Sequence, residues 1–241
     1  MKPVHILANP EDIAKRVVIA GDPARVKQLA GMLKEVKLVN SNRGYLTYTG
    51  YYNSTPITIA THGVGAPSMA IVVEELRMLG AEIIVRLGTT GAMIKEIDIG
   101  DIIIPTGAAY PYGGNTTSMY SPNGCMVAVP DPFLLRKFME NCEKFGIKYF
   151  AGPIFSSDAF YAEDPKFIEK WASRGIIAIE MECAALFILG LIRKFKSGAI
   201  LIVSNNLTKS EEERKLMATA EDIKKYVEKA FMVILETIIS I

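Results

Sequence analysis

The sequence predicts one α/β domain in which helices cover both faces of a mostly parallel or mixed β-sheet. Apolar, β-branched runs typical of buried strands recur along all 241 residues, and helical patterns lie between them. No linker rich in Pro, Gly or Ser divides the chain, and no internal repeat is visible. Half of the residues are hydrophobic, which is enough for a sizeable core in a single α/β unit of this length.

Seven runs are predicted as strands, and several of them are apolar throughout, as expected for strands buried on both faces. They span Val17–Ala20, Tyr45–Thr49, Ile57–Thr61, Ile83–Leu87, Ile102–Pro105, Ile176–Ile179 and Ile200–Ser204. Five segments carry helical start signals or an apolar stripe with helical spacing. They span Ser68–Gly80, Pro132–Lys144, Pro165–Arg174, Glu182–Lys194 and Ala220–Ile241. The stretch Tyr110–Val129, rich in Gly, Asn, Ser and Tyr, is predicted to be a long surface loop.

The charge balance excludes a strong general attraction to nucleic acid or to anionic membranes. Lys and Arg number 27 and Asp and Glu number 26, so the formal net charge is +1 and any anion site must be local. The N-terminal residues lack a secretory pattern, and no apolar run reaches the ~18 residues of a membrane span, which favours a cytoplasmic protein.

The three cysteines favour inert thiols. Cys125, Cys142 and Cys183 are widely spaced and form no CxxC pair, which argues against a zinc knuckle and against a secreted disulfide framework. A disulfide between subunits through Cys125 stays open.

Ligands of such folds gather where strands end and helices begin. The first such place is Gly21-Asp22-Pro23 with Arg25 on the first turn of the following helix. Glycine admits close approach of backbone N–H groups, a helix N-terminus favours an anion, and the arginine adds a full charge. A tight turn with a surface arginine explains the same residues equally well.

A second candidate is an arginine inside an apolar strand. Arg86 is costly to bury without a partner, and Thr89, Thr90 and Gly91 follow it in what we expect to be a hydroxyl-rich turn. The pattern favours a clamp for an oxyanion over a structural ion pair. Arg43, just before an amphipathic strand, is predicted from the residues alone to be solvated.

Three further segments end in residues that suit ligand binding: the first in two acids, the second in amides and the third in aromatic residues. Glu180 and Glu182 flank Met181 and would point to one side of an extended chain, where they could bind sugar hydroxyls, act as acid and base, or cap the next helix. Ser204-Asn205-Asn206 ends a buried strand and fits either recognition of a base edge or a plain turn. Phe160 and Tyr161 follow a polar turn and either stack on a base or belong to the core.

Several chemistries find no support. The chain has no GxxxxGK[ST], GxGxxG, HExxH or GxSxG motif, and its only histidines are His5 and His62. We therefore expect no metal and no cofactor. Arginines, hydroxyls, carboxylates and amides suit an anion, a sugar and a base together.

Seven motifs in order carry a resemblance that spans roughly residues 5 to 210: GDPARV, NRG, THGVG, RLGTTGA, SSDAFY, IEMECA and VSNN. Together they resemble the hexameric purine nucleoside phosphorylases of the purine and uridine phosphorylase family, nearest to the branch that includes methylthioadenosine phosphorylases. The resemblance implies a three-layer αβα sandwich with a central mixed sheet over residues 1–241. It also implies a homohexamer built as a trimer of dimers.

The resemblance further implies a role for each matching residue. The phosphate site would consist of Gly21, Arg25, Arg86 and Thr89, with Arg43 from a neighbouring subunit, so the solvated reading of Arg43 changes. The ribose would contact Met181 and Glu182, with His5 of the neighbour near its 5′ end. The base would lie against Thr90, Gly91 and Phe160, with Ser204 and Asn205 beside N7 and the 6-substituent. Inorganic phosphate would be a co-substrate, and Arg86, Glu182 and Asn205 would carry the catalysis.

The sequence departs from part of that family at one position. Many members have Ser-Asp where this chain has Ser204-Asn205, and an amide cannot protonate N7. We therefore expect inosine and guanosine to be preferred over adenosine, unless Asn206 or Arg214 compensates. A methylthioadenosine or uridine phosphorylase, a nucleosidase and a non-catalytic nucleoside-binding protein are the alternatives. A uridine phosphorylase usually has a Gln-x-Arg pair that Ala162–Lys166 lacks.

Overall fold

The computed structural model describes residues 2–113, 115–122, 124–161, 166–209 and 220–241, with only the backbone at 220 and 221. Its strands are β1 (Arg16–Ala20), β2 (Lys34–Asn40), β3 (Thr47–Tyr52), β4 (Thr55–Thr61), β5 (Ile83–Ala92), β6 (Ile102–Ala109), β7 (Tyr149–Ser156), β8 (Ala178–Glu180) and β9 (Lys196–Asn206). Its α-helices are α1 (Pro23–Ala30), α2 (Ala66–Met78), α3 (Thr116–Met119), α4 (Pro132–Lys144), α5 (Phe167–Ala172), α6 (Cys183–Arg193) and α8 (Ala220–Ile239). Short 3-10 turns occupy Pro10–Asp12 and Asn42–Gly44.

The strands form one mixed sheet in the order β2-β3-β4-β1-β5-β8-β7-β6-β9, in which β9 also pairs with β5. β1 runs parallel to β4 and β5, and β5 runs parallel to β9. Because β5, β8, β7, β6 and β9 each pair with the next and β9 returns to β5, these five strands close into a ring. Within the ring β8 is antiparallel to β5 and β6 is antiparallel to β9, and the carboxyl ends of β5 and β8 meet where Gly91 pairs with Ile179.

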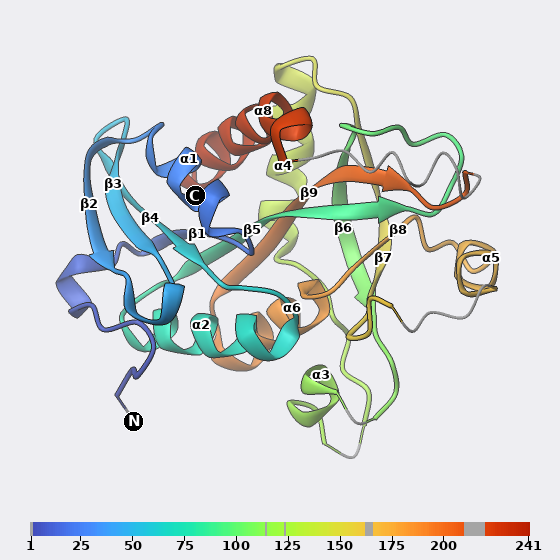
Figure 1. Cartoon of the computed structure of the whole chain (residues 1–241), viewed down its shortest axis with the longest axis horizontal. Coiled ribbons are helices and arrows are strands. Elements are labelled where there is room, and N and C mark those ends of the chain that lie inside the picture. The colour runs from blue at the N-terminus through green and yellow to red at the C-terminus, as the bar shows by residue number, and fades with distance from the viewer. Residues whose placement is uncertain (1, 114, 123, 162–165, 210–219) are drawn as a thin grey trace.

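Helices cover both faces of the sheet and bury two separate apolar clusters (Figure 1). α2 and α6 pack on one face, where Val17 and Ile19 of β1 point. α1, α4 and α8 pack on the other face, against Val18 and Ala20. This alternation along β1 is the period of two expected for a strand buried on both sides. The predicted three-layer αβα arrangement with a central mixed sheet is confirmed.

Most predicted elements occur, with three informative differences. β5 and β9 are longer than predicted, and each contains the residues that the sequence placed in a turn after it. β2 was not predicted because it is an exposed edge strand with a charged sequence, and β7 because Gly152-Pro153 interrupts its apolar run. The predicted loop at 110–129 is irregular except for the one turn of α3, within the residues described there. The predicted start of α5 at Pro165 lies outside the described residues.

The described helices include none that combines the length and the apolar character needed to span a bilayer.

Candidate active site

A cavity of about 550 Å³ lies at the carboxyl ends of β1, β4, β5, β7, β8 and β9. The residues that line it include eleven of the thirteen predicted site residues: Gly21, Arg25, Arg86, Thr89, Thr90, Gly91, Phe160, Met181, Glu182, Ser204 and Asn205. These residues come from five separate segments of the sequence. The sheet therefore assembles one site from patterns that are individually weak.

Arg86 lies at the floor of the cavity and is only 5% exposed. Its Nη2 donates to Oε2 of Glu182, and its Nη1 lies 3.6 Å from Oε2 of Glu180. Burial disfavours the charged guanidinium, but the two carboxylates outweigh burial and raise the pKa of Arg86 above its ordinary value. Nε and Nη1 make no hydrogen bond within the described part of the chain. The structural ion pair considered in the sequence analysis is therefore present, and the role of Arg86 as an anion clamp stays a prediction.

The two acids beside Arg86 have different surroundings. The Glu180 carboxylate accepts the N–H groups of Glu182 (2.8 Å) and Cys183 (3.0 Å), so it caps the start of α6. Burial raises the pKa of Glu180, against the opposing charge of Arg86. Burial acts in the same direction on Glu182, but the charge of Arg86 and the N–H of Gly65 hold its pKa below the ordinary value. Glu182 therefore stays ionised. Both acids line the cavity, but the Glu180 carboxylate is held by the backbone N–H groups and by the hydroxyl of Ser156.

Gly88 lets the Arg86 guanidinium lie across the strand. A Cβ at this glycine would be 1.7 Å from Nη1 and 2.4 Å from Cζ of Arg86. The sequence analysis gave Gly88 no role, although its position two residues after a buried arginine was a signal. The predicted turn at Thr89–Gly91 is wrong, since these residues continue β5 and pair with β9 across a register shift. Thr89 still lines the cavity.

Arg25 reaches the same cavity from the first turn of α1. The side chain of Asp22 caps that helix by accepting the N–H of Ala24 at 2.8 Å. Burial lowers the pKa of Arg25, Asp22 opposes this, and the charge of Arg86 lowers it further. Two arginines that repel each other across a cavity are stabilised by an anion between them.

The opposite wall of the cavity carries amides and hydroxyls at the end of β9. Asn205 lines it, with Oδ1 3.4 Å from the Ser204 hydroxyl, which also lies 3.4 Å from the carbonyl oxygen of Thr90. Asn206 points away and is 3% exposed. Its amide donates to the carbonyls of Ile94 (2.9 Å) and Ile97 (2.7 Å), so Asn206 has no capacity left for a substrate. The alternative in which Asn206 compensates for Asn205 is not supported by these contacts, and Arg214 lies outside the described residues.

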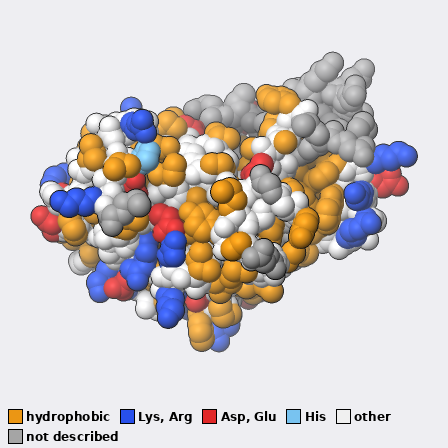
Figure 2. Space-filling view, turned by 90° about the horizontal axis from the view of Figure 1, so that it is seen from below, with side chains coloured by type: hydrophobic (Ala, Val, Ile, Leu, Met, Phe, Trp, Pro, Cys, Tyr) orange, Lys and Arg blue, Asp and Glu red, His pale blue; other side chains and the backbone are white. Residues whose placement is uncertain are grey.

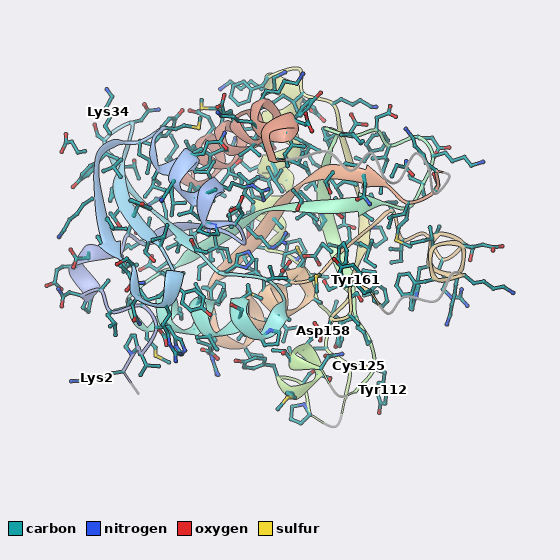
Figure 3. The ribbon with its side chains drawn as sticks, in the orientation of Figure 1. Lys2, Lys34, Tyr112, Cys125, Asp158 and Tyr161 are labelled. Carbon is teal, nitrogen blue, oxygen red and sulfur yellow. The ribbon has the colours of Figure 1, made fainter. Side chains whose placement is uncertain are left out.

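The SSDAFY segment closes one side of the cavity. Phe160 lines it while 57% exposed, and Tyr161 is 97% exposed, with the two ring centroids 5.0 Å apart. Neither ring belongs to the core, which favours the stacking interpretation of Phe160. Burial and the charge of Glu182 raise the pKa of Asp158, which Figure 3 shows close to Tyr161.

Two predicted residues do not reach the cavity of this chain. Arg43 is exposed, with a φ of 54°, and His5 binds Oε1 of Glu75 through Nδ1 at 2.8 Å. The two are nevertheless neighbours, because the amide of Asn42 donates to the carbonyl of His5 at 3.0 Å. The structure thus groups the two residues that the resemblance assigned to a neighbouring subunit.

The THGVG loop contributes groups that sequence reasoning did not assign. Gly63 and Val64 line the cavity, and the N–H of Gly65, a residue with φ of 83°, donates to Oε1 of Glu182 at 2.7 Å. Glycine tolerates this left-handed backbone, which aims the N–H at the carboxylate. The signal was a glycine-rich loop between a buried strand and a helix.

His62 of this loop is fully buried behind the cavity. Neither ring nitrogen has a hydrogen-bond partner among the described residues, and Thr61 Oγ1 and two Arg86 nitrogens are the other such buried atoms. Burial, together with the charge of Arg86, lowers the pKa of His62 to about 3. The imidazole is therefore neutral in the folded protein over the whole physiological range.

This shift predicts a loss of stability on acidification. The pKa of His62 in the folded protein is below the ordinary value of 6.5, so below pH 6.5 the unfolded chain binds a proton that the folded chain rejects. His62 then subtracts up to about 1.4 kcal/mol per pH unit from the free energy of unfolding until about pH 3. Between pH 6.5 and 5.0 the wild type should lose about 2 kcal/mol more than His62→Gln. Urea unfolding at both pH values and one protein concentration measures this, and equal losses would exclude the effect.

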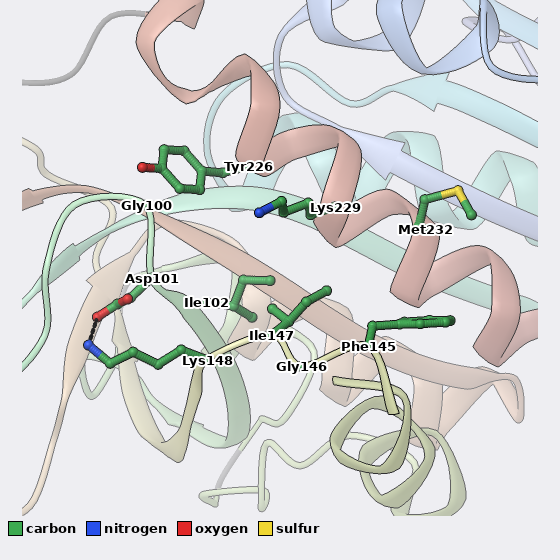
Figure 4. Close-up of a pocket in the computed structure, with 10 residues that line it drawn as sticks. All are labelled: Gly100, Asp101, Ile102, Phe145, Gly146, Ile147, Lys148, Tyr226, Lys229 and Met232. Atoms are coloured by element: carbon green, nitrogen blue, oxygen red, sulfur yellow. Dashed lines mark hydrogen bonds and ion pairs between the residues drawn. The ribbon is translucent and has the colours of Figure 1, made fainter. Parts of the chain in front are cut away.

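A second crevice, of about 440 Å³, lies between the start of β6, the end of α4 and α8 (Figure 4). Its walls are mainly apolar, and Lys148 pairs with Asp101 at one end of it at 2.7 Å. None of the predicted site residues lines this crevice. The candidate active site is therefore the cavity that contains Arg86.

All three cysteines are free. Cys142 and Cys183 are buried, in agreement with inert thiols, whereas Cys125 is exposed. Figure 3 shows Cys125 beside Tyr112 on the loop that carries α3, and both line one shallow pocket.

Comparison with known proteins agrees with this geometry. A family model described as the phosphorylase superfamily matches residues 15–240. A guanosine phosphorylase from Halorubrum lacusprofundi is 36% identical over 212 residues, which are 88% of this chain and 87% of the relative. A uridine phosphorylase from Treponema pallidum is 36% identical over 216 residues, which are 85% and 83% of the two chains.

Solved structures show the same fold. The crystal structure of a purine nucleoside phosphorylase from Toxoplasma gondii, in complex with immucillin-H, superposes with a TM-score of 0.89 at 27% identity. The match covers 98% of this chain and 94% of that one. Fold, motif order and sequence identity agree, and the chain belongs to the phosphorylase superfamily of purine and uridine nucleoside phosphorylases.

Proposed function

We propose that this chain is a purine nucleoside phosphorylase that converts inosine or guanosine and inorganic phosphate into free base and ribose 1-phosphate. One observation carries the proposal: a single cavity holds two arginines for an anion, an ionised carboxylate for a sugar and a free amide for a base. Those groups match the three parts of the two substrates. The guanosine phosphorylase among the relatives supports a 6-oxo purine.

Phosphate would bind between Arg25 and Arg86, close to Gly21 and Thr89. Nε and Nη1 of Arg86 are buried and make no hydrogen bond among the described residues, so they would gain a partner if the guanidinium turned toward the phosphate. Phosphate is itself the nucleophile, so the protein's task is to hold it in line with C1′ of the ribose.

Ribose would lie against Met181, with its 2′- and 3′-hydroxyls donating to Glu182. As the bond to the base breaks, the sugar gains oxocarbenium character, and the bound phosphate and Glu182 supply negative charge beside it. The bond to N9 breaks, its electron pair leaves with the base, and a phosphate oxygen forms the new bond to C1′.

The base would stack on Phe160 above Thr90 and Gly91, with its N7 and 6-substituent near Ser204 and Asn205. The Ser204 hydroxyl lies nearest to Oδ1 of Asn205, which leaves Nδ2 as the free donor. A 6-oxo purine presents two acceptors, N7 and O6, to that donor. An N–H there stabilises the negative charge of the leaving base, and loss of such a donor usually lowers the rate about 100- to 1,000-fold.

Besides the phosphate, ribose and base sites of this chain, the proposal includes a neighbouring copy that supplies Arg43 and His5. Support comes from exposed apolar residues close to them, among them Val4 (62% exposed), Leu7 (63%) and Val64 (74%), of which Val64 is also in the cavity wall. Hydrophobic side chains gather on the face that carries α2 and α3 (Figure 2). Burial of such a face between copies fits the proposed homohexamer of cytoplasmic subunits.

Initial rates on inosine, guanosine, adenosine, methylthioadenosine and uridine, each with and without phosphate, test the proposal. We expect cleavage to require phosphate and kcat/KM for inosine and guanosine to exceed that for adenosine at least about 10-fold. Asn205→Asp should shift this ratio toward adenosine, because an acid can protonate N7 and accept from a 6-amino group.

Each alternative has its own outcome. Cleavage without phosphate would identify a nucleosidase. Absence of cleavage, together with binding of a nucleoside in an equilibrium titration, would identify a binding protein. Preference for adenosine, methylthioadenosine or uridine would keep the reaction and refute the role of Asn205.

A further inference from the structure

One buried carboxylate holds the N-terminal arm, defined here as residues 2–9, against α2. Glu75 of α2 is only 6% exposed. Its two oxygens accept the backbone N–H groups of Val4 (3.1 Å), His5 (3.0 Å) and Ile6 (2.7 Å). Burial raises the pKa of Glu75, but the N–H of Ile6, the ring of His5 and the other two N–H groups together hold it below the ordinary value. Glu75 is therefore an ionised acceptor to which the arm supplies the donors.

The same carboxylate determines which nitrogen of the His5 imidazole carries the hydrogen. Nδ1 of His5 lies 2.8 Å from Oε1 of Glu75. An ionised carboxylate can only accept a hydrogen bond, so Nδ1 is the protonated nitrogen. In the neutral imidazole the lone pair is then on Nε2, which is left for a ligand. A free histidine side chain favours the opposite tautomer, with the hydrogen on Nε2.

Two further contacts fix the direction of the His5 ring. The amide of Asn42 donates to the carbonyl of His5 at 3.0 Å. The ring of Tyr45 meets the imidazole edge to face, with the centroids 5.8 Å apart. The His5 side chain nevertheless remains 16% exposed. The imidazole is thus held by its backbone and one nitrogen, while part of it stays accessible.

We propose that Glu75 is a positioning residue, which holds His5 with its hydrogen on Nδ1 so that Nε2 accepts from the 5′-hydroxyl of a ribose bound in the neighbouring copy. The inference rests on the proposed function, in which a neighbouring copy supplies His5. Glu75 itself touches no substrate and reaches the ribose only through His5. A lone pair on Nε2 favours a 5′ substituent that can donate a hydrogen bond. Nucleosides with a 5′-hydroxyl are therefore preferred over 5′-deoxy and 5′-methylthio nucleosides.

The tautomer can be observed without any substrate by 15N NMR of untagged protein labelled only at histidine. The chain has two histidines, His5 and His62, so the signals that disappear in His5→Asn belong to His5. We expect the neutral His5 ring to carry its hydrogen on Nδ1 in the wild type. In Glu75→Gln the hydrogen should move to Nε2, because the glutamine amide can donate to Nδ1. Hydrogen on Nε2 in the wild type would overturn the inference.

Initial rates with inosine and 5′-deoxyinosine at saturating phosphate measure the consequence for the reaction. In Glu75→Gln the ratio of kcat/KM for inosine to kcat/KM for 5′-deoxyinosine should fall about 3- to 10-fold, as expected for the loss of one hydrogen bond. The change should appear mainly as a higher KM for inosine. KM for 5′-deoxyinosine should stay the same, because this nucleoside has no hydroxyl for Nε2. An unchanged ratio would contradict the positioning role.

Two controls separate positioning from a general effect on the fold. Glu74→Gln removes an equal charge from the adjacent residue of α2, where Glu74 pairs with Arg193 at 2.8 Å. This variant should keep both the tautomer of His5 and the substrate ratio. In a His5→Ala background, Glu75→Gln should not change the ratio further, because its effect passes through His5. A further fall in the double variant would assign Glu75 a merely structural role.

The inference and the proposed function fail in different ways. Phosphorolysis of inosine together with an unchanged ratio in Glu75→Gln, or with the hydrogen of His5 on Nε2, removes only the inference. Absence of phosphorolysis with every nucleoside tested removes the proposed function, and with it the ribose that Nε2 would bind.

Discussion

Replacing Arg86 with methionine is expected to lower kcat/KM for phosphorolysis about 100- to 1,000-fold, as loss of a preorganised charged donor does. The same change should lower the free energy of unfolding by about 3–5 kcal/mol, because Glu182 loses its buried cation and Glu180 a nearby one. Removal of the cation also raises the pKa of Glu182, which Arg86 now holds down. Initial rates at varied phosphate and urea unfolding at pH 7 and 8 measure both effects.

Arg136→Met is the matched control, since Arg136 forms an ion pair with Glu140 on the surface at 3.4 Å. An exposed pair of this kind contributes about 0–1 kcal/mol, so stability and activity should both stay close to the wild type. A similar loss of stability in the two variants would contradict the buried-pair argument. Unchanged activity of Arg86→Met would remove Arg86 from the phosphate site.

The second large effect on activity is expected when a substitution adds a single methyl group beside Arg86. Gly88→Ala places a Cβ where the Arg86 guanidinium lies, 1.7 Å from Nη1, so the guanidinium must move by more than an ångström to restore contact distance. A misplacement of this size in a site that works by positioning lowers the rate about 100-fold. We expect the apparent affinity for phosphate to fall most, as measured by KM for phosphate at saturating inosine.

Gly124→Ala is the control for this change, because a Cβ there meets no atom within 4 Å. It should retain wild-type rates and stability. If Gly88→Ala kept its KM for phosphate, the geometry around Arg86 would not be required for the reaction.

The sequence predicted those strands and helices that are buried on one or two faces, because burial leaves an apolar pattern in the sequence. Apolar runs such as Val17–Ala20 located central strands, and the helix Pro132–Lys144 has the bounds that its caps predicted. β2 was not predicted from the sequence, because an edge strand that faces solvent needs no apolar pattern. The ring closure of β5 with β9 is a pairing between segments over 100 residues apart, which no local periodicity encodes.

The candidate site was predictable from the sequence where a charged residue, which is costly to bury, lies in or directly after an apolar run. Arg86 in a buried strand and Glu182 after another were detectable because burial of a charge demands a partner. That they are each other's partner depends on how β5 and β8 meet, and this is tertiary information. Gly88 and His62 remained unassigned because their significance lies in what packs against them, not in their own chemistry.

The strand ring has a consequence for synthesis on the ribosome. β9 is the last strand, yet it lies between β5 and β6, which are complete about 90 residues earlier in the chain. Until residues 196–206 emerge, β5 and β6 each present an unpaired edge of apolar residues, the kind of surface that invites misassociation and chaperone binding. The part of the cavity wall formed by Ser204 and Asn205 is therefore the last to be synthesised.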